Sequence, residues 1–233
     1  MKLIILAGGF GTRLQSVLKG CPKPLADING QPFIKFLFID WINSGFNDFI
    51  LSLHFEAQKI IEFIINEKEN GILKNCNIQY VVEPKPLGTG GAVAYVATKI
   101  KLEKSIYITN ADTWLNGGYV NMVKSKVNVI GVVKVPNTER YGRVNINEEN
   151  LIEEFSEKNN SKGTGYINAG FYKLDKNNFE NWNGNPFSIE KDLFPKLVND
   201  KKLKCLIIPD KFIDIGIPDD YYTFCEWQKT YIK

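Results

Sequence analysis

Histidine, cysteine and arginine are all scarce in this chain of 233 residues. The only histidine, His54, follows a strand-like run and is interpreted as a structural or surface residue, which argues against a histidine general base. The four cysteines are scattered and form no Cys-x-x-Cys pair, so neither a zinc site nor a disulfide framework is indicated. We therefore expect reduced thiols in a cytoplasmic protein.

Long apolar runs and a strong charge imbalance are also missing. No apolar stretch approaches the roughly 18 residues that a membrane span needs, and the apolar start of the chain runs directly into a glycine cluster, unlike a signal peptide. Lysine and arginine number 29 and aspartate and glutamate 26, so the formal net charge is only +3. A dedicated nucleic-acid binder usually carries a basic patch or stripe. We expect neither a membrane nor a nucleic acid as a partner.

What is present is typical of one globular α/β domain. The hydrophobic fraction is 44% and the charged fraction 24%, and no low-complexity linker or internal repeat interrupts the chain. In the first half, strand-like runs at residues 2–6, 48–53, 78–82 and 105–109 alternate with helical patterns at 32–43, 56–65 and 90–101. This alternation predicts βαβ units on a parallel sheet.

The second half has a different pattern. Strand-like runs at residues 127–135, 142–146, 151–155 and 165–174 are separated by turn-rich stretches, which predicts antiparallel strands added to the sheet. Residues 188–198 predict a helix that begins at Ser188, a preferred N-cap residue. Short strands are predicted at 203–208 and 212–215. The last helix is predicted at 218–232, with a proline at its start and two aspartates in its first turn.

A glycine cluster at residues 8–11 follows the first predicted strand and leads to Thr12 and Arg13. Glycines let the backbone approach an anion closely, and the arginine adds a fork that suits phosphate. Leu14 stands where a dinucleotide-binding fingerprint would have its last glycine, and no P-loop motif exists, so both of those sites are disfavoured. A second cluster places Lys23 between two prolines, where a stiff, extended backbone holds its ammonium group near a fixed position.

Together these clusters resemble the signature of the sugar-1-phosphate nucleotidyltransferases, also called nucleotide-sugar pyrophosphorylases. Further segments resemble motifs of that family, in the family's order, at residues 83–92, 110–112, 155–158, 168–172 and 214–218. The resemblance implies a Rossmann-like three-layer α/β sandwich with a mixed, mainly parallel sheet. Since the chain ends about a dozen residues after its last motif, we expect no C-terminal β-helix.

The resemblance also implies a reaction. An NTP and a sugar 1-phosphate would give an NDP-sugar and pyrophosphate by in-line attack of a sugar phosphate oxygen on the α-phosphorus. No covalent protein nucleophile is required, so catalysis would rest on positioning and charge neutralisation. Arg13 would hold the leaving phosphates, Lys23 would neutralise charge at the α-phosphate, and Asp112 is the third catalytic residue. Asp112 and Asp214 would share one Mg²⁺, which prefers hard oxygen ligands.

The remaining site residues form two sets. The nucleotide would be bound by Leu6, Ala7, Gly8, Gly9, Gly11, Thr12, Glu83, Pro86, Gly88, Thr89 and Ala111. The sugar phosphate would be bound by Gly142, Glu157, Lys158, Asn168 and Gly170. We therefore expect a single domain, 1–233, with a nucleotide-binding half at about 1–110 and a sugar-phosphate-binding half at about 111–233. The resemblance further implies a homo-oligomer, with a dimer as the expectation.

Glu83 indicates the base, because this position lies close to the nucleobase in the family. A carboxylate accepts two hydrogen bonds, and guanine offers N1–H and N2–H₂ side by side, whereas uracil and thymine offer one N–H. We therefore expect GTP. A short guanylyltransferase of one domain is most similar to the bacterial D-glycero-α-D-manno-heptose 1-phosphate guanylyltransferases, which implies a role in capsule polysaccharide biosynthesis.

Several alternatives stay open at this point. The sugar could be mannose 1-phosphate with GTP, or another sugar 1-phosphate used by a uridylyltransferase or thymidylyltransferase. A catalytically inactive regulatory relative should have lost Arg13, Lys23 or Asp112, and all three are present. A glycosyltransferase would normally show an Asp-x-Asp motif after the fourth strand, where this chain has Asn110-Ala111-Asp112.

Overall fold

The structure is a computed structural model that describes residues 1–18, 20–126, 128–156, 163–209 and 211–231. The chain divides into two compact units. The first unit comprises Met1–Lys85, Asn110–Asn116 and Phe212–Lys233, and the second comprises Pro86–Thr109 and Gly117–Lys211. These boundaries differ from the expected halves at about 1–110 and 111–233, because each unit takes segments from both sides of residue 110.

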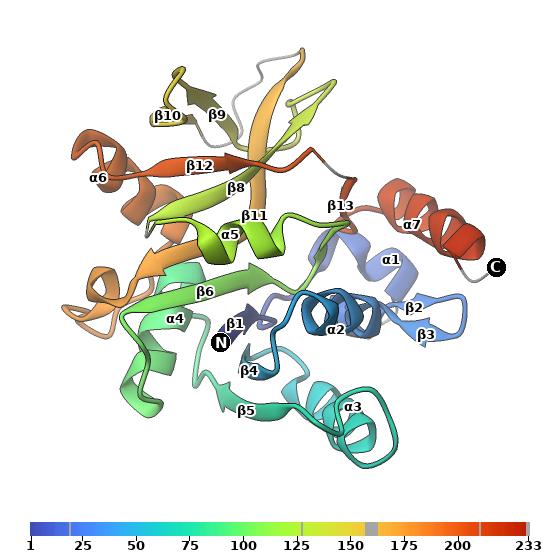
Figure 1. Cartoon of the computed structure of the whole chain (residues 1–233). Coiled ribbons are helices and arrows are strands. Elements are labelled where there is room, and N and C mark those ends of the chain that lie inside the picture. Colours follow the sequence, from blue (N-terminus) through green and yellow to red (C-terminus); the bar gives the residue numbers. More distant parts are fainter. Residues whose placement is uncertain (19, 127, 157–162, 210, 232–233) are drawn as a thin grey trace. The chain divides into compact units, whose positions relative to one another are not determined.

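Three parallel strands form the sheet of the first unit: β1 (Lys2–Leu6), β4 (Asp48–Leu53) and β5 (Asn77–Val82), in the order β1-β4-β5 (Figure 1). The middle strand is buried along five consecutive residues from Phe49 to Leu53. A near-continuous apolar run is what a parallel strand buried on both faces requires. The βαβ prediction for the first half of the chain is therefore confirmed in these three strands.

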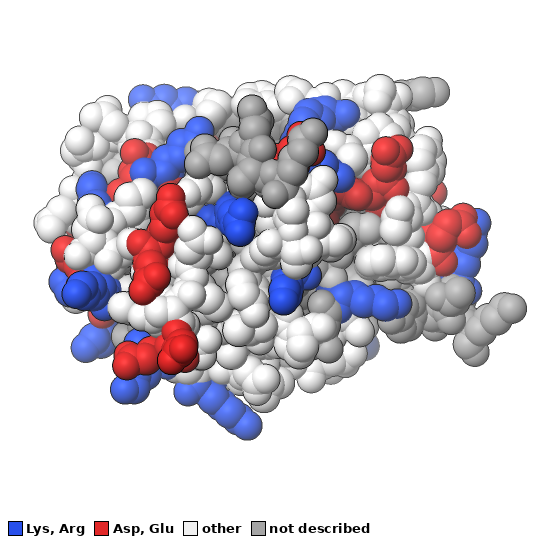
Figure 2. All heavy atoms as spheres, turned by 90° about the horizontal axis from the view of Figure 1, so that it is seen from above, with Lys and Arg blue, Asp and Glu red and all other residues white. Residues whose placement is uncertain are grey.

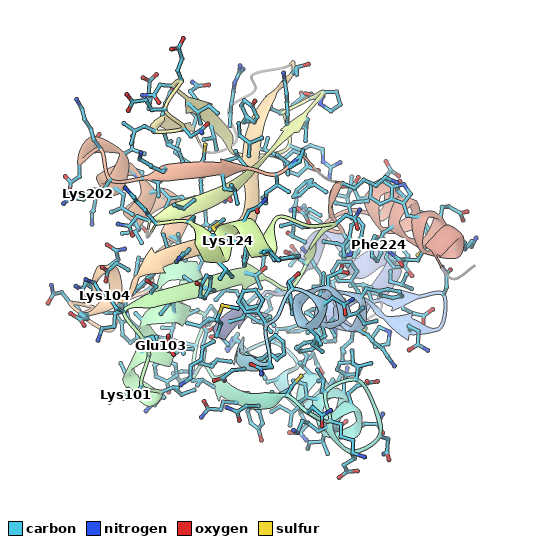
Figure 3. All side chains as sticks on the ribbon, in the orientation of Figure 1. Lys101, Glu103, Lys104, Lys124, Lys202 and Phe224 are labelled. Atoms are coloured by element: carbon cyan, nitrogen blue, oxygen red, sulfur yellow. The ribbon has the colours of Figure 1, made fainter. Side chains whose placement is uncertain are left out.

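Helices of the first unit bury one apolar side each. In α2 (Phe33–Asn43) the buried residues include Phe33, Leu37 and Trp41, spaced by four residues, which is the spacing of one helix face. Phe224 from the last helix is labelled in Figure 3. Its ring centroid lies 5.0 Å from that of Phe33 and 5.4 Å from that of Trp114. The other helical and hairpin elements are α1 (Gln15–Leu18), β2 (Asp27–Ile28), β3 (Gln31–Pro32), α3 (Ala57–Asn70) and α7 (Pro218–Tyr231).

A short antiparallel ladder joins two distant segments of the first unit. Strand β7 (Thr113–Leu115) pairs with β13 (Phe212–Asp214), so that Thr113 lies opposite Asp214. The backbone continues this contact, since the N–H of Ile215 donates to the carbonyl of Asp112 at 3.0 Å. This ladder places two acidic side chains, 102 residues apart in the chain, beside each other.

The long strand β11 (Gly165–Asp175) organises the second unit (Figure 1). It pairs antiparallel with three strands, and a parallel strand and a further antiparallel strand extend the sheet. The prediction of antiparallel strands in the second half is therefore confirmed. These other strands are β6 (Ser105–Asn110), β8 (Val129–Val135), β9 (Arg143–Ile146), β10 (Ile152–Ser156) and β12 (Lys204–Ile207). The helices are α4 (Gly88–Lys99), α5 (Tyr119–Lys124) and α6 (Phe194–Asn199).

Strand β11 is irregular in its middle. Residues Tyr166 and Ile167 pair with β9, whereas Phe171 and the residues after it pair with β6, and the register against β8 shifts between Asn168 and Tyr172. Gly170 adopts a left-handed backbone with φ of +70°, which favours glycine. The strand therefore has a bulge at the point where it changes neighbours, a feature common beside active sites.

The helix predicted at residues 188–198 is divided into two parts. Ser188 is the N-cap as expected, since its side chain accepts hydrogen bonds from the N–H groups of Glu190 and Lys191. The first part, Ile189–Leu193, is a π-helix, and α6 follows with Pro195 in its first turn. Proline has no N–H, so the α-helical bond back to residue 191 cannot form. The irregular turn therefore stands directly before a position where the regular helical hydrogen bond is absent.

Charges of both signs appear on the surface, as the small net charge predicts. On the face seen in Figure 2, lysine and arginine side chains alternate with aspartate and glutamate side chains. Among the described residues, none of the helices combines the length and apolarity that crossing a bilayer requires.

Candidate active site

Lys23 and Asp112 form an ion pair in the first unit. The Nζ of Lys23 lies 2.8 Å from Oδ2 of Asp112, and the Lys23 side chain is only 12% exposed. Burial by itself would lower the pKa of the Lys23 amine, but the adjacent Asp112 and the nearby Asp214 raise it, and the net shift is upward. Lys23 is therefore held as a cation by its ion pair. The extended backbone predicted from its two flanking prolines is wrong, because Lys23 begins the 3₁₀ turn Lys23–Leu25.

Asp214 lies beside this pair, and the ionised form of its carboxyl group is disfavoured. Its Oδ1 is buried and has no hydrogen-bond partner among the described residues. Burial, followed by repulsion from Asp112, raises the pKa of Asp214 to about 6, although Lys23, a hydrogen bond from the backbone of Gly216, and Arg13 act in the opposite direction. Burying a carboxylate oxygen without a hydrogen-bond partner lowers the stability of the folded protein. A ligand that bound this oxygen would remove that cost.

The two carboxylates fit a divalent metal ion. Mg²⁺ is commonly bound by one or two carboxylates together with the phosphates of its substrate, and an unpaired buried oxygen is a ready ligand. Among the described residues, no group of three or more His, Cys, Asp or Glu side chains gathers as a separate metal site. The pair predicted from sequence, Asp112 and Asp214, is therefore brought together by the fold, while the ion itself remains a proposal.

Arg13 completes a cluster of two cations and two anions. It lies in the short 3₁₀ turn Thr12–Leu14. A Cβ added to Gly216 would lie 3.3 Å from the guanidinium of Arg13 and 2.9 Å from Oδ1 of Asp214. The two side chains thus face the same backbone atom, and a larger residue than glycine at 216 would displace one of them.

Gly11 is required where the glycine loop passes Lys23. Its φ of +61° is in the left-handed region, and an added Cβ would lie 2.7 Å from Cγ of Lys23. The loop therefore packs against the aliphatic part of the Lys23 side chain, and only glycine fits at this position. The other loop residues from Leu6 to Thr12 join the end of β1 to this turn, and Ala111 donates its N–H to the carbonyl of Leu6 at 3.1 Å.

Glu83 is buried beneath the glycine loop. It follows β5 and is only 6% exposed. Its Oε1 accepts a hydrogen bond from the hydroxyl of Ser52 at 3.0 Å, and a Cβ added to Gly8 would lie 3.2 Å from the same oxygen. The Nδ1 of His54 lies 3.0 Å from the backbone carbonyl of Glu83. His54 thus has the structural contact expected of it, and Ser52 is a partner of Glu83 that the sequence did not reveal.

The predicted nucleotide loop at residues 86–89 belongs to the second unit and is clamped by Phe187. The N–H of Phe187 donates to the carbonyl of Leu87, and the N–H groups of Gly90 and Gly91 donate to the carbonyl of Phe187. A Cβ added to Gly88, whose φ is +72°, would lie 2.5 Å from that carbonyl oxygen. These amides at the start of α4 are therefore used inside the protein, and the glycines serve packing.

The predicted sugar residues Asn168, Gly170 and Gly142 are brought together in the second unit. The side chain of Asn168 accepts from the N–H of Gly170 at 3.0 Å, and its backbone N–H points to the carbonyl of Gly142 at 3.4 Å. Glu157 and Lys158, the other two predicted residues, lie outside the described residues.

A model of the nucleotidyl transferase family matches residues 2–229 of the chain. The chain is 38% identical to D-glycero-alpha-D-manno-heptose 1-phosphate guanylyltransferase of Campylobacter jejuni, over 96% of this chain and 98% of that protein. It is 33% identical to mannose-1-phosphate guanyltransferase of Schizosaccharomyces pombe, over 96% of this chain but only 63% of that longer protein.

Solved structures agree with this comparison. The crystal structure of HddC from Yersinia pseudotuberculosis superposes with a TM-score of 0.85 and 37% identity, over 97% of this chain and 99% of that one. A second structure of HddC, complexed with GMP-PN, gives a TM-score of 0.84. The likeness confirms the predicted Rossmann-like α/β fold.

Proposed function

The chain belongs to the nucleotidyl transferase family, and on that premise we propose that it joins GTP and D-glycero-α-D-manno-heptose 1-phosphate to give GDP-heptose and pyrophosphate. A phosphate oxygen of the sugar attacks the α-phosphorus of GTP. The bond from that phosphorus to the oxygen bridging the α- and β-phosphates breaks, and pyrophosphate leaves.

The observation that carries the proposal is the Lys23–Asp112 pair beside the unpartnered oxygen of Asp214. Lys23 is fixed by its ion pair, so its charge is in place before the reaction and neutralises the negative charge that develops around the α-phosphorus. Arg13 supplies a planar fork for the leaving phosphates, which a lysine could not match. Catalysis of this kind requires positioned charges and no protein nucleophile.

We propose Mg²⁺ as the cofactor, held by Asp112 and Asp214 with phosphate oxygens of the nucleotide. When bound, the ion polarises the phosphate and compensates the charge of the two carboxylates. The raised pKa of Asp214 and its unpaired Oδ1 support this role, because a cation would relieve both.

The choice of guanine rests on Glu83 and on relatives. The Oε1 of Glu83 lies beside Ser52 and Gly8, so a buried carboxylate faces the glycine loop, and a carboxylate matches the two adjacent N–H donors of guanine. The Campylobacter relative is named a guanylyltransferase, and HddC was solved with GMP-PN. The same name supports heptose 1-phosphate as the sugar substrate. Mannose 1-phosphate is the second candidate, favoured by the Schizosaccharomyces relative.

The test is pyrophosphate release in the presence of Mg²⁺. GTP, UTP, dTTP, CTP and ATP would each be combined with manno-heptose, mannose and glucose 1-phosphates. We expect the fastest turnover with GTP and heptose 1-phosphate, and no turnover after chelation of the metal. Preference for mannose 1-phosphate would replace the sugar, and preference for UTP or dTTP would refute the argument from Glu83. Absence of turnover from a folded protein in every combination would refute the proposal.

Three further points belong to the same proposal. We place the reaction in the cytoplasm, where nucleoside triphosphates are available, and its product in capsule polysaccharide biosynthesis. We also expect a homodimer, which light scattering coupled to gel filtration would test.

A further inference from the structure

Glu190 gathers hydrogen bonds from three segments of the second unit. Its Oε2 accepts from the hydroxyl of Thr89 at 2.6 Å and from that of Ser188 at 2.8 Å. Its Oε1 accepts from the hydroxyl of Tyr172 at 3.1 Å. Glu190 lies in the π-helix and Tyr172 ends the bulge of β11, so one carboxylate connects the two irregular backbone segments of this unit. Both kinds of irregularity are concentrated at functional sites.

From this network we infer that Glu190 is a positioning residue that sets the orientation of Asn168 for binding the hydroxyl groups of the sugar 1-phosphate. The inference rests on the proposed function, because the sugar-binding role of Asn168 belongs to it. Glu190 acts through Tyr172 and is not required to touch the substrate.

The argument depends on the direction of each hydrogen bond. An ionised carboxylate only accepts, so Tyr172 must donate its single hydroxyl proton to Glu190. The Tyr172 oxygen is then an acceptor and receives the Nδ2–H of Asn168 at 2.9 Å. Oδ1 of Asn168 is turned to the N–H of Gly170, 3.0 Å away. The amide of Asn168 is therefore held in one of its two orientations.

An amide held in one orientation can distinguish between arrangements of sugar hydroxyl groups. Nδ2 carries a second N–H and Oδ1 a second lone pair, so Asn168 can donate to one sugar oxygen and accept from a neighbouring hydroxyl. If the amide turned over, donor and acceptor would exchange places and the match would be lost. Because the amide is already ordered in the free protein, less conformational entropy is lost when the sugar binds.

The other oxygen of Glu190 fixes the clamp on the loop at residues 86–91. Thr89 donates to Glu190 and at the same time accepts from the N–H of Ile189 at 2.9 Å. Oε2 accepts two hydroxyl donors, from Thr89 and Ser188, and holds the loop, whereas Oε1 accepts one, from Tyr172. A glutamine at this position could keep its carbonyl on Thr89 and Ser188, but its NH₂ would then face Tyr172.

This difference defines the decisive variant, Glu190→Gln. With NH₂ facing it, Tyr172 can no longer donate to residue 190, so its proton is free to turn toward Asn168. The amide of Asn168 is then no longer held in one of its two orientations. We expect the KM for the sugar 1-phosphate to rise about tenfold, while the KM for GTP and kcat change less than about threefold. Tyr172→Phe removes the link itself and should raise the same KM by a similar factor. The double variant should be no worse than either single variant, because both act on one chain of bonds.

Glu67→Gln is the matched control. Glu67 is a buried carboxylate of the first unit that accepts from Lys35 at 2.9 Å and from the N–H of Ile72 at 3.0 Å. Its substitution should lower the melting temperature and leave both KM values within twofold. A merely structural role of Glu190 would make Glu190→Gln behave like this control.

All kinetic measurements use the nucleotide and sugar that the wild-type protein turns over best, so a wrong sugar in the proposed function does not affect them. Calorimetric titration of the same sugar 1-phosphate gives the dissociation constant without turnover and should show the same tenfold loss. An unchanged sugar constant in Glu190→Gln, an equal rise in the GTP constant, or additive effects in the double variant would overturn the inference. So would a wild-type protein that binds none of the sugar 1-phosphates.

Discussion

The two units hold their candidate functional side chains in different ways. In the first unit, charges of opposite sign face one another. Asp112 and Asp214 are placed by a two-strand ladder, and Lys23 reaches Asp112 from a short 3₁₀ turn. In the second unit, Asn168 is placed by a relay of hydroxyl groups that ends on a single carboxylate. The first arrangement fixes where charge lies, and the second fixes which way a neutral group points.

This difference teaches that the two regions tolerate different substitutions. A cluster of charges responds to any change of charge, because each member compensates the others at short range. A relay of hydroxyl groups responds to a change of hydrogen-bond direction, even between side chains of equal size. The following variants test that division.

Asp112→Asn should have the largest effect. It removes the partner of Lys23 and one of the two proposed metal ligands, while keeping the size of the side chain. We expect kcat/KM to fall by about 10³-fold or more in the pyrophosphate-release assay. Asp48→Asn is the control, because Asp48 is a carboxylate of the same unit that accepts from Asn77 in an exposed contact, and it should keep activity within twofold. A comparable loss in both variants would contradict a special role of the cluster.

Asp214→Asn should lower activity and raise stability at the same time. Folding raises the pKa of Asp214 from 3.8 to about 6, so between these values the folded protein binds more protons than the unfolded chain. The stability contributed by this group is therefore highest at low pH and is lost as the pH rises through 6. Above that pH the ionised carboxylate costs roughly 2–3 kcal/mol, which asparagine would avoid.

The measurement is thermal unfolding of the metal-free and nucleotide-free protein from pH 4 to pH 8. Asp214→Asn should melt several degrees higher than the wild type at pH 7.5, and the difference should shrink as the pH falls below 6. A lower melting temperature of the variant at pH 7.5 would mean that the carboxylate stabilises the empty site, contrary to the geometry.

Gly88→Ala should destabilise the second unit by about 2 kcal/mol or more, because the new Cβ meets a backbone carbonyl that cannot move away like a side chain. Gly184→Ala is the matched control, since Gly184 has a similar φ of +86° but nothing within 4 Å of an added Cβ. This variant should lose only about 1 kcal/mol of unfolding free energy, which is the energy needed to hold an alanine in the left-handed conformation. Equal losses of unfolding free energy in urea would show that the Phe187 clamp adds nothing.

Ser188→Ala should have the smallest effect. The hydroxyl caps the N–H groups of Glu190 and Lys191, and its loss should cost about 1 kcal/mol of unfolding free energy. The same urea titration measures it. A loss above that of Gly88→Ala would show that the Ser188 cap contributes more to stability than the close packing of the loop at 86–91.

The charged cluster was predictable from the sequence mainly through the family resemblance. The glycines at a strand end and the lysine between prolines are local signals, but each is weak by itself, and the two aspartates have no local signal of their own. The pairing of Asp112 with Asp214 needed the family resemblance, because nothing local connects β7 with β13. The individual roles of these residues in binding and catalysis stay predictions.

The relay in the second unit was not predictable. Glu190 stands in a segment with an ordinary helical signal, and that signal does not distinguish the π-helix at Ile189–Leu193 from a regular α-helix. Tyr172 and Thr89 are likewise common residues in common places. Their hydroxyl groups meet only after β11, α4 and the segment at 187–190 are folded together, so pattern and propensity carry no trace of the contact.

The clamp of Phe187 on the glycines at 88, 90 and 91 has a consequence for inheritance and for engineering. The first two of these positions require glycine because Phe187 occupies the space that a side chain would need. The loop and its packing partner therefore depend on each other, although they lie about a hundred residues apart in the chain. Residues 86–91 and 187–190 therefore have to be exchanged together when sequences are recombined. A chimera that receives residues 86–91 without residues 187–190 would lack the backbone and side chain that pack against its glycines, and we expect it to be less stable.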